Sequence, residues 1–145
     1  LIERIHQQMR EATSAVADPV GRMHALIDTV FASPARNRAF YAAYLDFASL
    51  ATRRESFRQV NEAFYLGCHD IERAILVDGI AQGVIPAQDP DRAVTSLRAL
   101  FDGLMLRWLA ELDPEATFEG YRDRCRKESL AILGIQDSHD AWRTA

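Results

Sequence analysis

The sequence predicts an all-α fold, a bundle of six helices packed in orthogonal and antiparallel pairs. Along most of the 145 residues, apolar side chains recur three and four positions apart, the spacing of one helix face. No segment alternates strictly between apolar and polar residues, and no Asn-Gly or Asp-Gly turn joins two strand-like runs. Hydrophobic residues make up 48% of the chain, which suffices for the core of one domain.

Two amphipathic helices are expected first. In 1–17 the apolar side chains fall on one side and the charged ones opposite. Asp18 and Pro19 end this helix, because the residue before a proline disfavours the helical conformation. The second helix covers 19–32, with Pro19 at its first position, and it ends at Ser33.

The middle of the chain holds an aromatic helix and the longest helix. The stretch 35–53 is helical in its spacing and rich in aromatic side chains, namely Phe40, Tyr41, Tyr44 and Phe47. The following helix, 54–82, carries one apolar stripe at one-turn spacing. Gly83 suits the position just past its end, where a left-handed backbone is common.

The helix expected over 89–112 organises the rest of the chain. Pro90 suits the first helical position, and Asp89 suits the positive end of the helix dipole. Apolar residues lie on nearly every side of this helix and leave only a thin polar strip through Arg98 and Asp102. A helix of this kind must be covered on nearly all sides. The pattern therefore predicts a position between the core and a second subunit.

A last helix over 114–133 is expected to pack beside 89–112 and to form the dimer interface with it, two helices from each subunit making a four-helix bundle. The sequence leaves open which stripe of 89–112 faces the partner. The domain is expected to span 1–135, with 136–145 as a polar tail. The side chains predicted at the interface are Leu97, Leu100, Leu104, Trp108, Phe118, Tyr121, Cys125 and Leu133.

Composition excludes several classes of function. The net charge of −4 favours neither nucleic acid nor an anionic membrane surface. The two cysteines form no disulfide framework or zinc pattern, so a reducing cytoplasm is expected. No apolar run reaches the roughly 18 residues of a membrane span, and no secretory signal precedes the fold. The chain begins inside a helix without a methionine, so we expect residues upstream of Leu1.

A small-molecule cavity is expected among the helices, because large apolar and aromatic side chains are in surplus there. His24, Tyr44 and Asn61 add polar atoms at or near the apolar stripes, and a buried polar group needs a partner. Each of these residues could equally belong to an ordinary core or bond to a neighbouring helix. The predicted ligand-binding side chains are Met9, Met23, His24, Ile27, Phe31, Phe40, Tyr44, Phe47, Asn61, Phe64, Cys68 and Phe101.

The sequence gives no sign of a metal, a cofactor or catalysis. His69 and Glu72 have one-turn spacing, but a metal site needs further ligands. Cys68 has no identifiable base beside it and is expected to be a small buried residue. No serine lies in a G-x-S-x-G elbow, and no glycine pattern marks a phosphate loop. An enzyme is therefore not expected.

Several motifs together resemble a known family. They are the aromatic FYAAYLDFASLA, the GVIP connector with its following Asp-Pro helix start, and LRALFDGLMLRWLAEL. Over about 1–135, the sequence is similar to the C-terminal effector-binding and dimerisation domain of TetR-family transcriptional regulators, especially the branch that includes the betaine-responsive repressor.

The resemblance implies a homodimer formed by the last two helices and a small-molecule pocket within about 1–110. It also implies that operator DNA is bound only through a helix-turn-helix domain, which no stretch of this chain resembles.

The favoured hypothesis is a ligand-sensing, dimerising domain of a bacterial repressor with a small, mostly apolar effector. The alternatives are a helical protein–protein interaction domain without an effector and, third, a small helical enzyme. An interaction domain should expose a large apolar patch beyond the dimer face. An enzyme should show a cleft with strongly perturbed titratable groups. A sensor should enclose a largely apolar cavity with a few polar groups.

Overall fold

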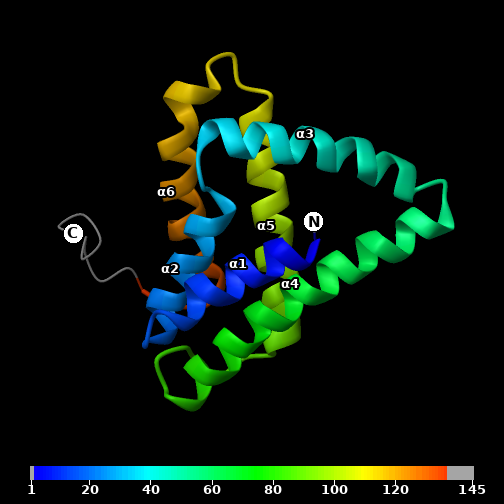
Figure 1. Ribbon diagram of the computed structural model, residues 1–145. Helices are drawn as coiled ribbons and strands as arrows, with labels where there is room; N and C mark the ends of the chain where they lie inside the picture. The colour runs from blue at the N-terminus through cyan, green and yellow to red at the C-terminus, as the bar shows by residue number, and fades with distance from the viewer. Residues whose placement is uncertain (1, 137–145) are drawn as a thin grey trace.

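The computed structural model describes residues 2–136, which form α-helices joined by short loops and contain no β-strand (Figure 1). The predicted all-α fold with six helices is confirmed, and most predicted boundaries lie within three residues of the observed ones. The helices are α1 Ile2–Ser14, α2 Pro19–Val30, α3 Pro34–Ala51, α4 Glu55–Ala81, α5 Pro90–Leu109 and α6 Pro114–Ile132.

The starts of four helices are fixed by a side-chain cap followed by proline. Asp18, Ser33, Asp89 and Asp113 precede α2, α3, α5 and α6, and each accepts a hydrogen bond from a backbone N–H of the first turn. These bonds satisfy donors that have no partner within the helix. Proline costs nothing at this position because its missing N–H would be unpaired anyway.

The first helix is three residues shorter than predicted. It ends at Ser14, and the backbone carbonyls of Val16 and Ala17 accept hydrogen bonds from the Arg22 side chain instead of from a further helical turn. The same guanidinium lies 2.7 Å from the Asp78 carboxylate. Arg22 therefore fastens the turn before α2 to the end of α4.

Two pairs of antiparallel helices, with α1 and α2 packed against them, make up the architecture. The helices α5 and α6 run side by side in antiparallel directions and form the most extensive contact of any two helices, whereas α3 and α4 form a long hairpin that extends away from them (Figure 1). The helix α1 crosses α4, and α2 packs on α1, α4 and α6.

The core packs against one side of α5, the helix that the sequence predicts to lie between the core and a second subunit. One side of α5 is completely buried, whereas Gly103, Leu106 and Arg107 on its other side are exposed. The largest fully buried side chains are Trp108, Phe31, Phe101, Phe118, Met23, Leu26, Ile27, Leu76, Ile85, Leu97, Met105 and Leu133.

None of the described helices combines the length and apolar character that a membrane crossing requires. The predicted tail over 136–145 lies, apart from Gln136, outside the described residues. The proposed division between a domain over 1–135 and this tail stays a prediction.

Candidate functional site: two adjoining cavities beside α1

The larger of the two adjoining cavities, here called the outer cavity, has a volume of about 590 Å³. It lies where the N-terminal half of α1 crosses the α3–α4 hairpin, and its wall is mainly apolar. Its volume falls in the range of cavities that hold small organic ligands. It is lined by Ile2, Glu3, Ile5, Phe40, Ala43, Tyr44, Phe47, Val60, Asn61 and Phe64.

Aromatic side chains form much of this wall. The ring of Phe40 stacks on Tyr44 at 6.1 Å between centroids, and Phe64 of α4 lies 6.0 Å from Tyr44. Asn61 is the polar exception, because its Oδ1 atom is buried with no hydrogen-bond donor among the described residues. A buried acceptor without a partner costs free energy, and the same residue lines the outer cavity.

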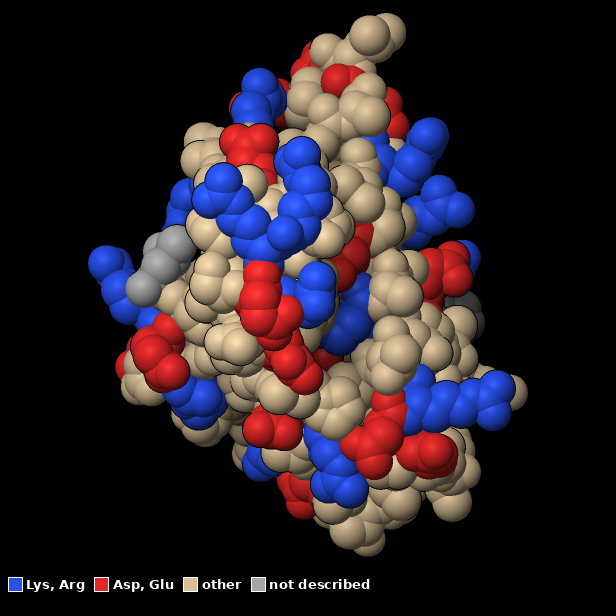
Figure 2. Space-filling view, turned by 90° about the vertical axis from the view of Figure 1, so that its right-hand side faces the viewer, with Lys and Arg blue, Asp and Glu red and all other residues tan. Residues whose placement is uncertain are grey.

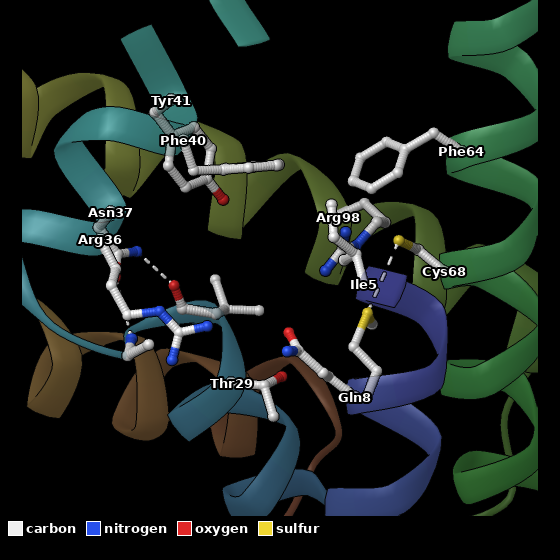
Figure 3. A pocket seen from close by; sticks show the side chains of 13 residues that line it. Ile5, Gln8, Thr29, Arg36, Asn37, Phe40, Tyr41, Phe64, Cys68 and Arg98 are labelled. Carbon is white, nitrogen blue, oxygen red and sulfur yellow. Dashed lines mark hydrogen bonds between the residues drawn. The ribbon is translucent and has the colours of Figure 1, made fainter. Parts of the chain in front are cut away.

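A smaller inner cavity of about 130 Å³ adjoins the outer one and shares Ile5, Phe40 and Phe64 with it. Its wall includes polar side chains from four helices, and Figure 3 shows them around one space between α1, α2, α3 and α5. It is lined by Ile5, Gln8, Met9, Thr29, Val30, Ala32, Arg36, Asn37, Phe40, Tyr41, Phe64, Cys68 and Arg98.

Arg98 enters the inner cavity from α5 and is held there by Glu72 of α4. One Nη atom lies 2.7 Å from Glu72 Oε1, and the Glu72 side chain is fully buried. The guanidinium also lies over the Phe101 ring at 4.9 Å. Burial raises the pKa of Glu72 to about 7, although the positive charge of Arg98 acts in the opposite direction.

A second polar chain links the outer cavity to α5. The hydroxyls of Tyr44 and Tyr65 are 2.5 Å apart, and Tyr65 donates to Asp102 Oδ2 at 2.6 Å. Burial, followed by the bond to Asp102, raises the pKa of Tyr65 far above its ordinary value. Both tyrosines therefore stay protonated and act as hydrogen-bond donors at neutral pH.

Contacts with α4 hold α1 beside the cavities. The ring of His6 stacks on Phe64 at 5.7 Å, and His6 Nε2 lies 3.0 Å from the Phe64 carbonyl oxygen. Phe64 lines both cavities, and Ile2 and Ile5 of α1 line the outer one. The position of α1 is thus set by residues that also shape the cavities.

The predicted ligand-binding residues divide into two groups. The structure brings together at the cavities Met9, Phe40, Tyr44, Phe47, Asn61, Phe64 and Cys68. Four others are fully buried but line neither cavity, because neighbouring side chains fill the space around them: Met23, Ile27, Phe31 and Phe101. His24 is half-buried on α2 and also lies outside both cavities.

The sequence prediction missed the polar residues of the inner cavity, among them Arg98, Asn37 and Tyr41. A signal existed for Arg98, because it interrupts the apolar face of its helix, as Glu72 interrupts the apolar stripe of α4. Two opposite charges on two core-facing stripes indicate a buried pair, since an isolated charge would not be buried.

Most residues predicted at the dimer interface are enclosed within their own subunit. The buried ones are Leu97, Trp108, Phe118, Cys125 and Leu133. Leu100, Leu104 and Tyr121 are half-buried and retain surface that a partner could cover. The exposed side of α5 presents Ala99, Gly103 and Leu106, so a partner there would meet these residues first.

Across residues 2–136, histidine, cysteine, aspartate and glutamate side chains nowhere gather in a group of three or more that could hold a metal ion. Cys68 and Cys125 are buried free thiols, and burial raises the pKa of Cys68 to about 11. Neither thiol is therefore appreciably ionised at neutral pH.

Comparison with known proteins relates this architecture to a family. The family model described as "BetI-type transcriptional repressor, C-terminal" matches residues 19–133. A crystal structure of a TetR transcription regulator from Haloarcula marismortui is similar, with a TM-score of 0.74 and 23% sequence identity over 91% of this chain and 74% of that chain. At this identity the similarity shows the fold alone.

No curated protein sequence matches the chain. The family match covers most of the chain, which therefore belongs to the BetI-type C-terminal domains of TetR-family transcriptional regulators.

Proposed function

We propose that this chain is the ligand-sensing and dimerising domain of a TetR-like repressor, with a small, mostly apolar effector. The observation that carries the proposal is the outer cavity, which has about 590 Å³ of largely apolar space between α1 and the α3–α4 hairpin. Apolar walls with a few polar atoms are typical of sites for small organic molecules.

The effector would act through α1. Ile2 and Ile5 of α1 line the outer cavity, and His6 joins the same helix to Phe64. A ligand that occupies the cavity would therefore favour one position of α1 relative to α4. A ligand shifts such an equilibrium only through its different affinity for the two positions.

In this proposal operator DNA is bound by a helix-turn-helix domain outside the 145 residues. The face in Figure 2 supports this division, because acidic and basic side chains are intermixed on it and neither sign forms a broad patch there. The net charge of the chain is −4. Binding to the phosphate backbone depends on a concentration of positive charge.

The dimer would form through the exposed side of α5 together with α6. A Cβ atom at Gly103 of α5 or Gly120 of α6 would meet no atom within 4 Å, so neither glycine is covered by its own subunit. The lack of a side chain there would let a partner helix approach closely. Leu106 adds an apolar side chain that is 48% exposed. Two such pairs of helices would complete a four-helix bundle.

The alternative of an interaction module would need a broad exposed apolar patch. The exposed large apolar side chains of the described residues are spread over α3, α4, α5 and two loops, at Leu45, Val60, Leu66, Val77, Val84, Leu106 and Leu112. Scattered single apolar residues are normal on a protein surface, so this distribution favours the sensor.

A neutral apolar dye tests the sensor. N-phenyl-1-naphthylamine becomes fluorescent in an apolar enclosure, and we expect saturable binding to the wild-type chain. Val60→Trp places an indole at the outer cavity and should weaken dye binding at least tenfold. Val77→Trp is the matched control, because Val60 and Val77 both lie on α4 and are both 42% exposed, but Val77 lines neither cavity. Equal dye binding by both variants, or none by the wild type, would overturn the proposal.

A further inference from the structure

We propose that the effector is an amphipathic carboxylic acid, whose carboxylate binds Arg98 in the inner cavity while its apolar body occupies the outer cavity. This inference rests on the proposed sensor function and specifies the chemical class of the ligand. Three observations support it: the sign of the charges in the inner cavity, the donors that Arg98 leaves unused, and the wall that the two cavities share.

The charged side chains that line the inner cavity are both arginines, Arg36 and Arg98, and its lining contains no aspartate or glutamate. The remaining polar lining includes the amide of Gln8 and the hydroxyls of Thr29 and Tyr41. All of these groups can donate hydrogen bonds. In Figure 3 the Arg98 side chain extends from α5 towards Ile5 and Gln8 of α1. The space therefore suits an anion better than a cation.

Arg98 has more donors than its protein partner uses. A guanidinium carries five N–H donors, and Glu72 approaches one Nη atom at 2.7 Å. The Nε atom of Arg98 is buried and has no acceptor among the described residues. Glu72 lines neither cavity, so its contact with the guanidinium does not occupy the space that a ligand would take. A carboxylate matches the planar fork of arginine and can accept two parallel hydrogen bonds.

The residues that the two cavities share indicate where the apolar part of the ligand would lie. Ile5, Phe40 and Phe64 line both cavities, so they form the boundary that a molecule anchored at Arg98 would cross to reach the outer cavity. The inner cavity, at about 130 Å³, holds little more than a head group, whereas the outer cavity is several times larger and is mostly apolar. An acid with a polar head and an apolar chain or ring fits this division.

The test compares three probes that share one apolar chain and differ in the charge of the head group. Octanoate, 1-octanol and octylammonium are titrated calorimetrically into the wild-type 145-residue chain. We expect octanoate to bind at least tenfold more tightly than either other probe. The double variant Arg98→Gln with Glu72→Gln removes both charges together, so that no buried charge is left without its partner. It should lose the preference for octanoate while it still binds N-phenyl-1-naphthylamine.

A spectroscopic measurement on the wild type keeps the test independent of how the variant folds. The side-chain Nε–H resonance of Arg98, assigned by its absence from the spectrum of Arg98→Lys, should shift when octanoate is added and should not shift with 1-octanol. Octanoate binding without this shift would overturn the role of Arg98.

The outcomes separate the two proposals. If the dye binds but 1-octanol or octylammonium binds as tightly as octanoate, the carboxylate is wrong and the sensor stands. The same conclusion follows if the dye binds and none of the three probes does. If the dye does not bind the wild type either, the proposed sensor function itself fails.

Discussion

The imidazole of His6 on α1 occupies the space next to Gly67 on α4 so closely that a Cβ atom at Gly67 would lie 2.1 Å from His6 Cε1. Atoms do not approach to this distance without displacement. Gly67 therefore permits α1 to lie directly on α4, at the point where His6 reaches the Phe64 carbonyl oxygen. The separation of these helices is set beside the two cavities.

Gly67→Ala tests this contact. The added methyl group should push His6 away and break its bond to the Phe64 carbonyl oxygen, because the methyl group and the imidazole ring would occupy the same space. Overpacking of this kind typically costs about 1–3 kcal/mol. Denaturant unfolding followed by circular dichroism measures the loss.

A double variant separates the steric effect from helix propensity. In His6→Ala with Gly67→Ala the ring is absent, so the alanine at 67 should no longer destabilise and should behave as the better helix former that it is. The cycle of four proteins gives the coupling energy between the two positions. Additive effects of the two substitutions would contradict the contact.

Glu72→Gln tests the buried ion pair. Burial raises the pKa of Glu72 from its ordinary 4.5 to about 7, so the folded protein binds a proton more tightly than the unfolded chain does. The stability that this group contributes is fully present below pH 4.5 and is lost as the pH rises through 7. Glutamine resembles the protonated glutamate. The variant and the wild type should therefore be about equally stable at pH 5.

At pH 8 the glutamine variant should be more stable than the wild type. The shift of the Glu72 pKa from 4.5 to about 7 corresponds to a difference on the order of 3 kcal/mol in the free energy of unfolding. Parallel urea titrations at the two pH values cancel the contribution of every other acidic group. A wild type that is more stable than the variant at pH 8 would show that the ionised pair with Arg98 is favourable on balance.

Tyr65→Phe tests the polar chain between α3, α4 and α5. The substitution removes the donor to Asp102 and the partner of the Tyr44 hydroxyl together, so a partly buried carboxylate loses a 2.6 Å hydrogen bond. A loss of about 1–3 kcal/mol is expected. Tyr44→Phe is the control, because it leaves the bond from Tyr65 to Asp102 intact and should cost less. Equal losses in thermal unfolding would assign the effect to tyrosine packing instead.

The fold could be predicted from the sequence because its signals are local. Each of the capped helices starts where an aspartate or serine precedes a proline, as at Asp18 and Asp113. These signals act within a few residues, so they do not depend on how the helices pack against one another. The three-residue error at the end of α1 arose because Arg22, a residue of the next helix, takes over the carbonyls of Val16 and Ala17.

The candidate site could be predicted only in part, because a cavity forms where the side chains of neighbouring helices do not fill the space between them. Phe31 and Phe40 both lie on predicted inward faces, but Phe31 is enclosed beside Phe118 at 5.8 Å between rings, whereas Phe40 borders both cavities. Helical spacing shows which side of a helix faces inward and does not show whether the opposite side chains fill the space. For the same reason it could not show that Trp108 is covered by its own subunit.

Leu106→Glu tests the proposed dimer. Leu106 is 48% exposed on the free side of α5, and a carboxylate there would lie inside the bundle formed by two subunits, where burial of an unpaired charge is costly. The matched control is Leu66→Glu, because Leu66 is 57% exposed and belongs to α4, outside the two helices of the proposed interface. Both positions tolerate glutamate in the isolated subunit, since both are open to solvent.

Sedimentation velocity at micromolar concentration should therefore find a dimer for the wild type and for Leu66→Glu, and a monomer for Leu106→Glu. A monomeric wild type would reject the dimer. A dimeric Leu106→Glu would show that Leu106 lies outside the buried part of the interface.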